Sequence, residues 1–278
     1  MSETAQLDRK TQAKAAPARA KPAVTLPEHI VEVISDSGEG AQRCGQSLAA
    51  IAARSGNGIW TVEIIPAEIQ PPARSVAGAS GIRIRIGSKA VTNGGDETDL
   101  AVAFNEQVLL GRVRAGELKK GATILLENMW REHRDPAIVK SFDDTVKSLV
   151  KDGFNVVEIP LERECRSLMN DPRRGKNMFV LGMLLSIYSL DLQLGRDQVA
   201  LTFGKKDRSV IDANVKLLEA GFAWAEANLA FKYAIPATKS TVPQVVTNGN
   251  TAIALGVLAS GMDICAMYPI TPATSASH

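Results

Sequence analysis

Cysteine, histidine and aromatic residues are scarce in this sequence. Its 278 residues include three cysteines and three histidines, and aromatic residues make up 5%. Cys44, Cys165 and Cys265 lie far apart and form no C-x-x-C pair. They are too few for an iron–sulfur cluster, which four thiolates hold, and an odd, sparse set of cysteines is no disulfide framework. We therefore expect a reducing, cytoplasmic setting and, because the histidines are equally scattered, no metal site.

A charge excess and long apolar runs are also absent. The formal net charge is +2, whereas a nucleic-acid-binding surface needs clustered excess Lys and Arg. No apolar run approaches the roughly 20 residues that cross a bilayer, and positions 1–20 lack the apolar core of a secretory signal. The composition, 45% hydrophobic, predicts a globular protein with neither a nucleic-acid nor a membrane partner.

The pattern along most of the chain is that of an α/β domain. Residues 1–26 are rich in Ala, Lys and Pro and predict a disordered tail. From His29 on, apolar strands alternate with helical stretches, which indicates a largely parallel sheet with helices on its faces. We expect this domain to span residues 27–231, with helices from residue 175 on that cover the sheet or bind a neighbour. The expected strands are 29–35, 59–65, 81–87, 99–105, 122–128 and 154–161.

A second unit is expected near the end of the sequence. Residues 232–248 contain two prolines, several Ser and Thr residues and no helical period, which predicts an interdomain linker. Residues 249–278 then predict one helix, a short strand at 263–268 and the beginning of another helix. Because so short a segment cannot close a core, we expect it to be the start of an incomplete domain.

A glycine-rich turn, SGEGAQRCG, follows the first expected strand and opens the first helix. Gly38 and Gly40 fit the first two positions of the dinucleotide fingerprint G-x-G-x-x-G, but Arg43 occupies the third. Such a turn lets backbone approach a phosphate, and the helix N-terminus supplies N–H donors. Two interpretations stay open: Gly38 and Gly40 bind an anion, or they only permit a tight turn.

The stretch PAEIQPPARSVAGAS at 66–80 is long for a loop in an α/β domain, where roughly 2–6 residues are usual. Arg74, with small residues behind it, can present its guanidinium group to a carboxylate or a phosphate. Alternatively, the loop packs on a partner subunit, together with Arg83 and Arg85 of the following strand. The sequence does not decide between these two roles.

The corner YPITP joins the expected strand at 263–268 to the last helix. Thr271 is a preferred N-cap residue, and Pro272 suits the first helical position. The hydroxyl of Thr271 and the free N–H groups of a helix N-terminus can hold a carboxylate, and open α/β sheets bind ligands at the carboxyl ends of their strands. The alternative is that Thr271 only caps its helix and Tyr268 only packs.

The stretch GNTAIALGVLASGMDICAMYPITPATS resembles the opening of the pyrimidine-binding domain in the alpha subunit of 2-oxoacid:ferredoxin oxidoreductases. The preceding domain is similar to the gamma domain of that family in the stretches SGEGAQRCG, EIQPPARSVAGASGIRIRIGS and GKNMFVLG. The resemblance covers nearly all of residues 28–278. A gamma domain placed ahead of the alpha segment resembles the two-subunit 2-oxoglutarate enzymes.

This resemblance implies a function and a set of partners. The implied reaction converts 2-oxoglutarate and coenzyme A to succinyl-CoA and CO₂ and passes electrons to ferredoxin. Thiamine diphosphate, Mg²⁺ and a [4Fe–4S] cluster would be held mainly by a partner beta subunit, in a heterodimer or a dimer of heterodimers. Thr271 and Tyr268 would contact the substrate, Gly38, Gly40 and Arg74 would contact coenzyme A or a phosphate, and this chain alone would be inert.

Two other classes of function remain open on the sequence. A free-standing nucleotide-dependent oxidoreductase needs a complete fingerprint and a finished second domain, and the sequence shows neither. A non-catalytic interaction module would use residues 66–86 and the helices after residue 175 as a docking surface. The second alternative also describes much of what a gamma domain can do inside a larger enzyme.

Overall fold

The computed structural model describes residues 21–68, 71–169, 171, 174–269 and 273–277. The strands are β1 (Val24–Thr25), β2 (Glu28–Asp36), β3 (Gly58–Ile64), β4 (Ala79–Gly87), β5 (Thr98–Ala103), β6 (Leu118–Glu127), β7 (Asn155–Ile159) and β8 (Tyr233–Ala234). The helices are α1 (Ala41–Ser55), α2 (Glu106–Arg114), α3 (Pro136–Lys151), α4 (Leu161–Arg166), α5 (Lys176–Ile187), α6 (Leu192–Phe203), α7 (Arg208–Asn228) and α8 (Gly249–Ala259). Short 3₁₀ turns are η1 (Val76–Gly78), η2 (Met129–Glu132) and η4 (Ala273–Ala276).

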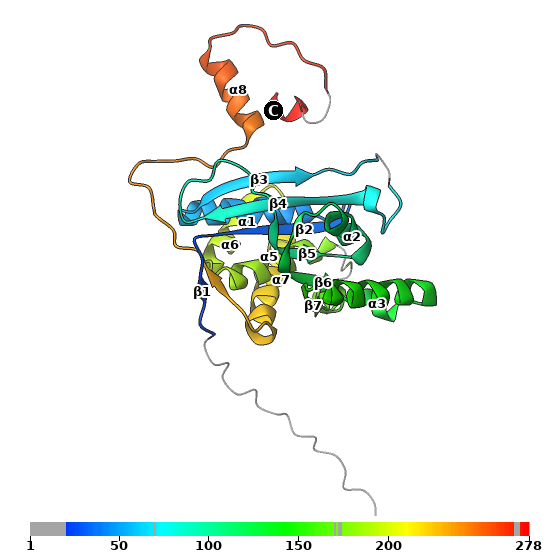
Figure 1. The fold of residues 1–278 in the computed structure, drawn as a ribbon. Coiled ribbons are helices and arrows are strands. Elements are labelled where there is room, and N and C mark those ends of the chain that lie inside the picture. Colours follow the sequence, from blue (N-terminus) through cyan, green and yellow to red (C-terminus); the bar gives the residue numbers. More distant parts are fainter. Residues whose placement is uncertain (1–20, 69–70, 170, 172–173, 270–272, 278) are drawn as a thin grey trace, which may run out of the picture.

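Six strands form the main sheet in the order β3-β4-β2-β5-β6-β7 (Figure 1). Strands β2, β5, β6 and β7 pair in parallel, while β4 lies between β2 and β3 and is antiparallel to both. Strand β3 therefore has the same direction as β2, to which α1 connects it, and β4 alone runs against the others in this sheet. The predicted α/β class with a largely parallel sheet is confirmed.

Helices cover both faces of the sheet. One core cluster joins α1, α5 and α7 to one face, and a second joins α2 and α3 to the other. Every residue of α5 is buried, because α5 lies beneath α7 and next to α1. Gly182 of α5 and Gly221 of α7 allow this packing, since a Cβ atom on either would lie 1.9 Å from a carbonyl oxygen of the other helix. The predicted covering helices after residue 175 are thus part of the core.

Short polar side chains begin several helices. The Asn105 side chain accepts hydrogen bonds from the first free N–H groups of α2, and the Asp135 side chain does the same for α3. Pro136 stands in the first turn of α3, where its missing N–H costs no hydrogen bond. These caps fix where α2 and α3 begin, and Asn105 thereby fixes a position at the carboxyl end of β5.

The ends of the α/β domain differ from the expected boundaries. Strand β1, inside the segment expected to be a tail, pairs with β8, inside the expected linker. The Lys21 ammonium donates to the carbonyl oxygens of Glu226 (2.7 Å) and Leu229 at the end of α7. The Asn57 side chain donates to the carbonyl oxygens of residues 235 and 236, at 3.2 and 3.3 Å. The chain therefore packs on the domain from residue 21 to residue 236. Residues 1–20 are outside the described residues, so the tail stays a prediction there.

The segment after the linker contains the expected helix but not the expected strand. Helix α8 forms as predicted, and Asn248 caps its first turn. Residues 263–269 form no strand, because a β-strand needs a neighbour with which to pair and the described residues offer none there. The large apolar side chains of this segment are exposed; they include Ile253, Leu258, Met262 and Ile264.

Candidate functional site

The carboxyl ends of β2, β5 and β6 meet at one edge of the sheet. Helix α1 follows β2 and packs on one face, whereas α2 follows β5 and packs on the other. The chain thus leaves two neighbouring parallel strands in opposite directions, which makes the end of β2 and β5 a topological switch point, where open α/β sheets bind ligands. We call this place the carboxyl edge; it consists of residues 36–40, 74–78, 104–106, 127–130 and 176–177.

The glycine turn lies at the carboxyl edge, as expected, and needs its glycines. Gly38 and Gly40 have φ angles of 90° and 87°, in the left-handed region that glycine adopts without strain. A Cβ atom on Gly40 would lie 2.7 Å from the Asn177 side-chain nitrogen, whereas around Gly38 nothing lies within 4 Å. Gly40 therefore serves packing against α5, and Gly38 leaves open space beside the backbone.

A buried lysine closes the turn from the side of α5. The Lys176 ammonium lies 2.9 Å from a carboxylate oxygen of Glu39 and 3.9 Å from one of Glu162, and it lies 5.5 Å from the centre of the Phe104 ring. Glu39 also accepts a hydrogen bond from the backbone N–H of Asp36, at 3.3 Å. The Glu39 carboxylate is therefore held by Lys176 and by the Asp36 backbone, and no side chain of the described residues caps the start of α1.

Arg74 lies beside the glycine turn, so the structure brings it close to Gly38 and Gly40, which belong to another segment of the sequence. Its backbone N–H donates to both carboxylate oxygens of Asp36, at 3.0 and 2.9 Å. Its guanidinium group pairs with the buried carboxylate of Glu106 and lies over the Trp130 ring, 4.4 Å from the ring centre. Glu106 neutralises the charge of Arg74, and the contacts of Arg74 with Asp36 and Glu106 hold the loop at 71–78 in place. Its φ of 54° is rare for a residue with a side chain and is kept by these contacts.

Glu127, at the end of β6, is the group with the most shifted acidity at this edge. Burial raises the pKa of its carboxyl to about 7, although the Lys176 ammonium lowers it in part. The two carboxylate oxygens accept backbone N–H groups of Met129 (3.0 Å) and Glu162 (2.8 Å). Glu127 thus changes charge near neutral pH while it ties η2 and α4 to the sheet.

Sequence reasoning missed both Lys176 and Glu127. The available signal was a charged residue at the end of an otherwise apolar segment, because a charge in such a place is buried only with a partner. Arg43, at the third fingerprint position, has its guanidinium group over the Phe203 ring of α6, 5.8 Å from the ring centre. The edge carries more carboxylates than cations: the carboxylates are Asp36, Glu39, Glu106 and Glu127, with Glu162 of α4 beside Lys176, and the cations are Arg74 and Lys176.

Tyr268, one of the two predicted substrate contacts, is not part of this edge. Tyr268 is 77% exposed and belongs to the segment 263–269, where no strand forms. Thr271 lies outside the described residues, so its predicted contact with a carboxylate stays a prediction. The Asn250 side chain of α8 donates to the Ser275 hydroxyl at 2.6 Å, which holds η4 beside the start of α8. The predicted helix after the corner is thus a short 3₁₀ turn among the described residues.

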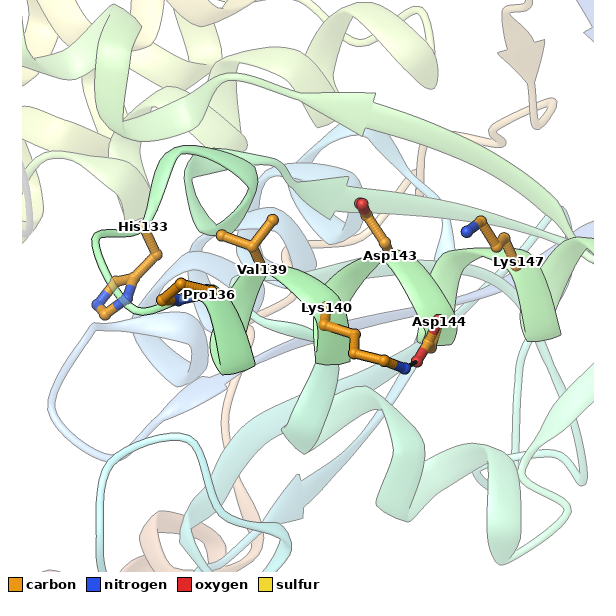
Figure 2. Close-up of a pocket in the computed structure, with 7 residues that line it drawn as sticks. All are labelled: His133, Pro136, Val139, Lys140, Asp143, Asp144 and Lys147. Carbon is orange, nitrogen blue, oxygen red and sulfur yellow. Dashed lines mark hydrogen bonds and ion pairs between the residues drawn. The ribbon is translucent and has the colours of Figure 1, made fainter.

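The described residues also bear on two other kinds of site, a metal site and a ligand pocket away from the carboxyl edge. The residues that the structure describes contain no group of three or more His, Cys, Asp or Glu side chains that could hold a metal ion. A surface hollow of about 490 Å³ lies along α3 (Figure 2). Its lining comes from α3 and from His133, three residues ahead of that helix, and Lys140 and Asp144 there pair with each other. No set of groups converges in it, so we assign it no ligand.

None of the helices in the described part of the chain combines the length and the apolar character that a bilayer crossing requires.

Curated relatives of the chain are subunits of oxidoreductases that act on 2-oxoacids. The 2-oxoglutarate oxidoreductase subunit KorA of Mycobacterium tuberculosis is 30% identical over 90% of this chain and 40% of its own length. The ketoisovalerate oxidoreductase subunit VorA of Methanothermobacter marburgensis is 30% identical over 72% of this chain and 37% of its own length. The chain therefore spans about two fifths of the length of these relatives.

Solved structures share the fold. The 2-oxoglutarate:ferredoxin oxidoreductase from Magnetococcus marinus, with 2-oxoglutarate, coenzyme A and succinyl-CoA bound, matches 91% of this chain and 40% of its own, with a TM-score of 0.72 and 24% identity. The pyruvate oxidoreductase subunit PORC from Thermotoga maritima matches with a TM-score of 0.50 and 19% identity, over 71% of this chain and 97% of its own. Nearly all of a separate subunit there thus corresponds to part of this chain.

The model of the family described as pyruvate ferredoxin/flavodoxin oxidoreductase matches residues 32–224. This range is more than half of the chain, runs from β2 into α7 and includes the whole carboxyl edge. The predicted resemblance is thereby confirmed at the level of the family. The chain belongs to the pyruvate ferredoxin/flavodoxin oxidoreductase family.

Proposed function

We propose that this chain is part of a 2-oxoglutarate:ferredoxin oxidoreductase. The observation that carries the proposal is the similarity to the Mycobacterium tuberculosis subunit. It covers 90% of the chain and so extends past residue 224, where the match to the family model ends. The ketoisovalerate subunits cover 72% and 73% of the chain. The wider similarity therefore favours 2-oxoglutarate as the substrate.

In the proposed reaction the bond between C1 and C2 of 2-oxoglutarate breaks, and C1 leaves as CO₂. C2 becomes the carbonyl carbon of a thioester with the sulfur of coenzyme A, which yields succinyl-CoA. Two electrons pass singly to two ferredoxin molecules, and one proton is released. The family membership argues against the alternative of a free-standing nucleotide-dependent enzyme.

The proposal assigns thiamine diphosphate, Mg²⁺ and the [4Fe–4S] cluster to a partner beta subunit. The described residues do not fit a metal ion or a cluster, because they contain no group of three suitable side chains. Cys44 and Cys165 are buried singly, and burial raises the pKa of both thiols. This chain then needs its partner for activity, in a heterodimer or a dimer of heterodimers.

We further propose that coenzyme A approaches the carboxyl edge. The open space beside Gly38 leaves room for a phosphate near the N-terminus of α1, which favours anions. Because Glu106 neutralises the charge of Arg74, we assign Arg74 an indirect role: it fixes the loop at 71–78 beside this site. Arg74→Ala in the assembled enzyme should raise the KM for coenzyme A about tenfold with little change in kcat. Unchanged kinetics with weaker assembly would instead assign the loop to docking.

The substrate contact is proposed for Thr271 and Tyr268. The support is the sequence pattern of an N-cap followed by proline, together with the exposure of Tyr268, which leaves its ring free to line a cleft shared with the partner. Thr271→Val should raise the KM for 2-oxoglutarate while the KM for coenzyme A stays the same. Thr247→Val, in the linker, serves as the matched control and should change neither constant.

The function as a whole is tested with the full-length protein and its partner subunit. Reduction of ferredoxin is measured with 2-oxoglutarate, pyruvate or 2-oxoisovalerate, each with and without coenzyme A. We expect the highest kcat/KM for 2-oxoglutarate and a strict requirement for coenzyme A. Preference for another oxoacid would refute the substrate, and no coenzyme A-dependent reduction with any of them would refute the function.

A further inference from the structure

Strand β3 ends the main sheet and has no neighbour on its outer side among the described residues. Its seven residues pair with β4 in unbroken register, from Gly58 opposite Gly87 to Ile64 opposite Gly81. It contains no proline, no lysine and no bulge, the features by which proteins usually protect a sheet edge. A row of backbone N–H and C=O groups is therefore available to another strand.

The outermost strand on the opposite side of the main sheet, β7, does carry such protective features. Strand β7 has only five residues, and its Glu158 carboxylate is held by the Arg131 guanidinium group at 2.6 Å. Pro160 follows the strand and removes a donor at its end. The contrast between the two edges identifies β3 as the strand suited to pairing.

The side chains of β3 present an apolar patch on the face away from α1. Trp60 and Val62 alternate along the strand and so share this face, and they are 43% and 44% exposed. The neighbouring positions on β4 are two arginines that are paired with carboxylates of β2. These pairs, Arg83–Glu32 and Arg85–Glu28, each at 2.7 Å, form a polar border beside the patch. An apolar centre with a polar border is the usual composition of a protein interface.

We propose that β3 pairs antiparallel with β3 of a second copy of this chain, about a two-fold axis at Thr61. In this register Trp60 faces Val62 of the second copy, and the same pair occurs again by symmetry. Thr61 faces Thr61 of the second copy, and Ile59 faces Glu63 of the second copy. Aromatic side chains opposite β-branched ones stabilise antiparallel pairs, and a two-fold interface requires such self-complementarity.

The charges also suit a second copy. Glu63 is the sole charged residue of β3, and the Gln46 side chain of α1 donates to its carboxylate at 3.0 Å. No like charges therefore face each other across the proposed axis. A single pair of strands buries less than the roughly 1,600 Å² of a standard stable interface, so the dimer should be weak and depend on concentration. This inference is independent of the proposed reaction.

The test uses sedimentation velocity of the full 278-residue chain from about 1 to about 100 µM. We expect a monomer–dimer equilibrium that W60K or V62E alone weakens about tenfold or more, because each places two charges opposite apolar side chains. The double variant W60K/V62E puts opposite charges face to face twice and should restore the dimer. L201K, at a 70% exposed position on α6, is the control and should dimerise like the wild type.

Circular dichroism melting of each variant verifies that the chain is folded. A chain that stays monomeric over the whole range would overturn the proposal. So would a dimer that both single variants leave unchanged, because its interface would lie elsewhere. Failure of the folded double variant to recover the dimer would exclude the register about Thr61 and thereby the pairing as stated.

Discussion

Glu127 should make the protein less stable as the pH rises from about 5 to about 8. Burial raises the pKa of its carboxyl from an ordinary value of 4.5 to about 7. Each pKa unit corresponds to about 1.4 kcal/mol, so the shift amounts to about 3 kcal/mol of unfolding free energy. Since the folded-state pKa is the higher one, this contribution is fully present below about pH 4.5 and is lost as the pH rises through about 7.

Glu127→Gln isolates this effect because the amide carries no charge at any pH. The variant loses one of the two backbone hydrogen bonds that the carboxylate accepts, which costs about 1 kcal/mol. We therefore expect it to be less stable than the wild type by about 1 kcal/mol near pH 4. Near pH 8 it should be more stable by about 2 kcal/mol, since the buried charge is gone.

Urea unfolding followed by circular dichroism at both pH values measures this difference. Glu132→Gln, at an exposed position in η2, is the matched control, and its pH profile should run parallel to that of the wild type. Parallel profiles for the wild type and Glu127→Gln would refute the reasoning, because the carboxyl of Glu127 would then titrate alike in the folded and unfolded chains.

Two further predictions concern the core and the thiols. Gly182→Ala should lower the unfolding free energy by roughly 2 kcal/mol, because its Cβ would lie 1.9 Å from the Leu218 carbonyl oxygen. Gly256→Ala in α8 is the control: nothing lies within 4 Å of its Cβ, so it should not lower the melting temperature of the domain. Equal effects of the two substitutions would contradict the close α5–α7 packing. Ellman's reagent should label Cys265 in the folded protein and the other two cysteines only after unfolding, since these are buried and have raised pKa values. Rapid labelling of all three thiols would contradict the described burial.

The sheet could be predicted because its strands are apolar runs rich in β-branched residues. The stretch GIRIRIG predicted a strand with one buried face, and Ile82, Ile84 and Ile86 indeed lie in the core beneath α1. Its other face could not be predicted: Arg83 is buried because Glu32 of β2 pairs with it. The direction of β4 was also hidden, since alternation of side chains does not say which strand is the neighbour.

The candidate site could be predicted only in its local parts. The left-handed turn at Gly38 and Gly40 follows from residue type and position. The contact between Glu39 and Lys176 joins residues 137 positions apart, and no local pattern reveals such a pair. The predicted strand at 263–268 fails for the same reason, because a strand forms only where the tertiary structure provides a neighbour.

The most direct test of the proposed reaction follows isotopic label through the complete enzyme. Full-length protein, partner subunit, coenzyme A and oxidised ferredoxin are incubated with 2-oxoglutarate that carries ¹³C at C1 or at C2. The account predicts that C1 appears in CO₂ and C2 in the thioester carbonyl of succinyl-CoA, and that this chain without its partner forms neither product. Label from C1 in CO₂ without label from C2 in succinyl-CoA, or turnover by this chain alone, would contradict it.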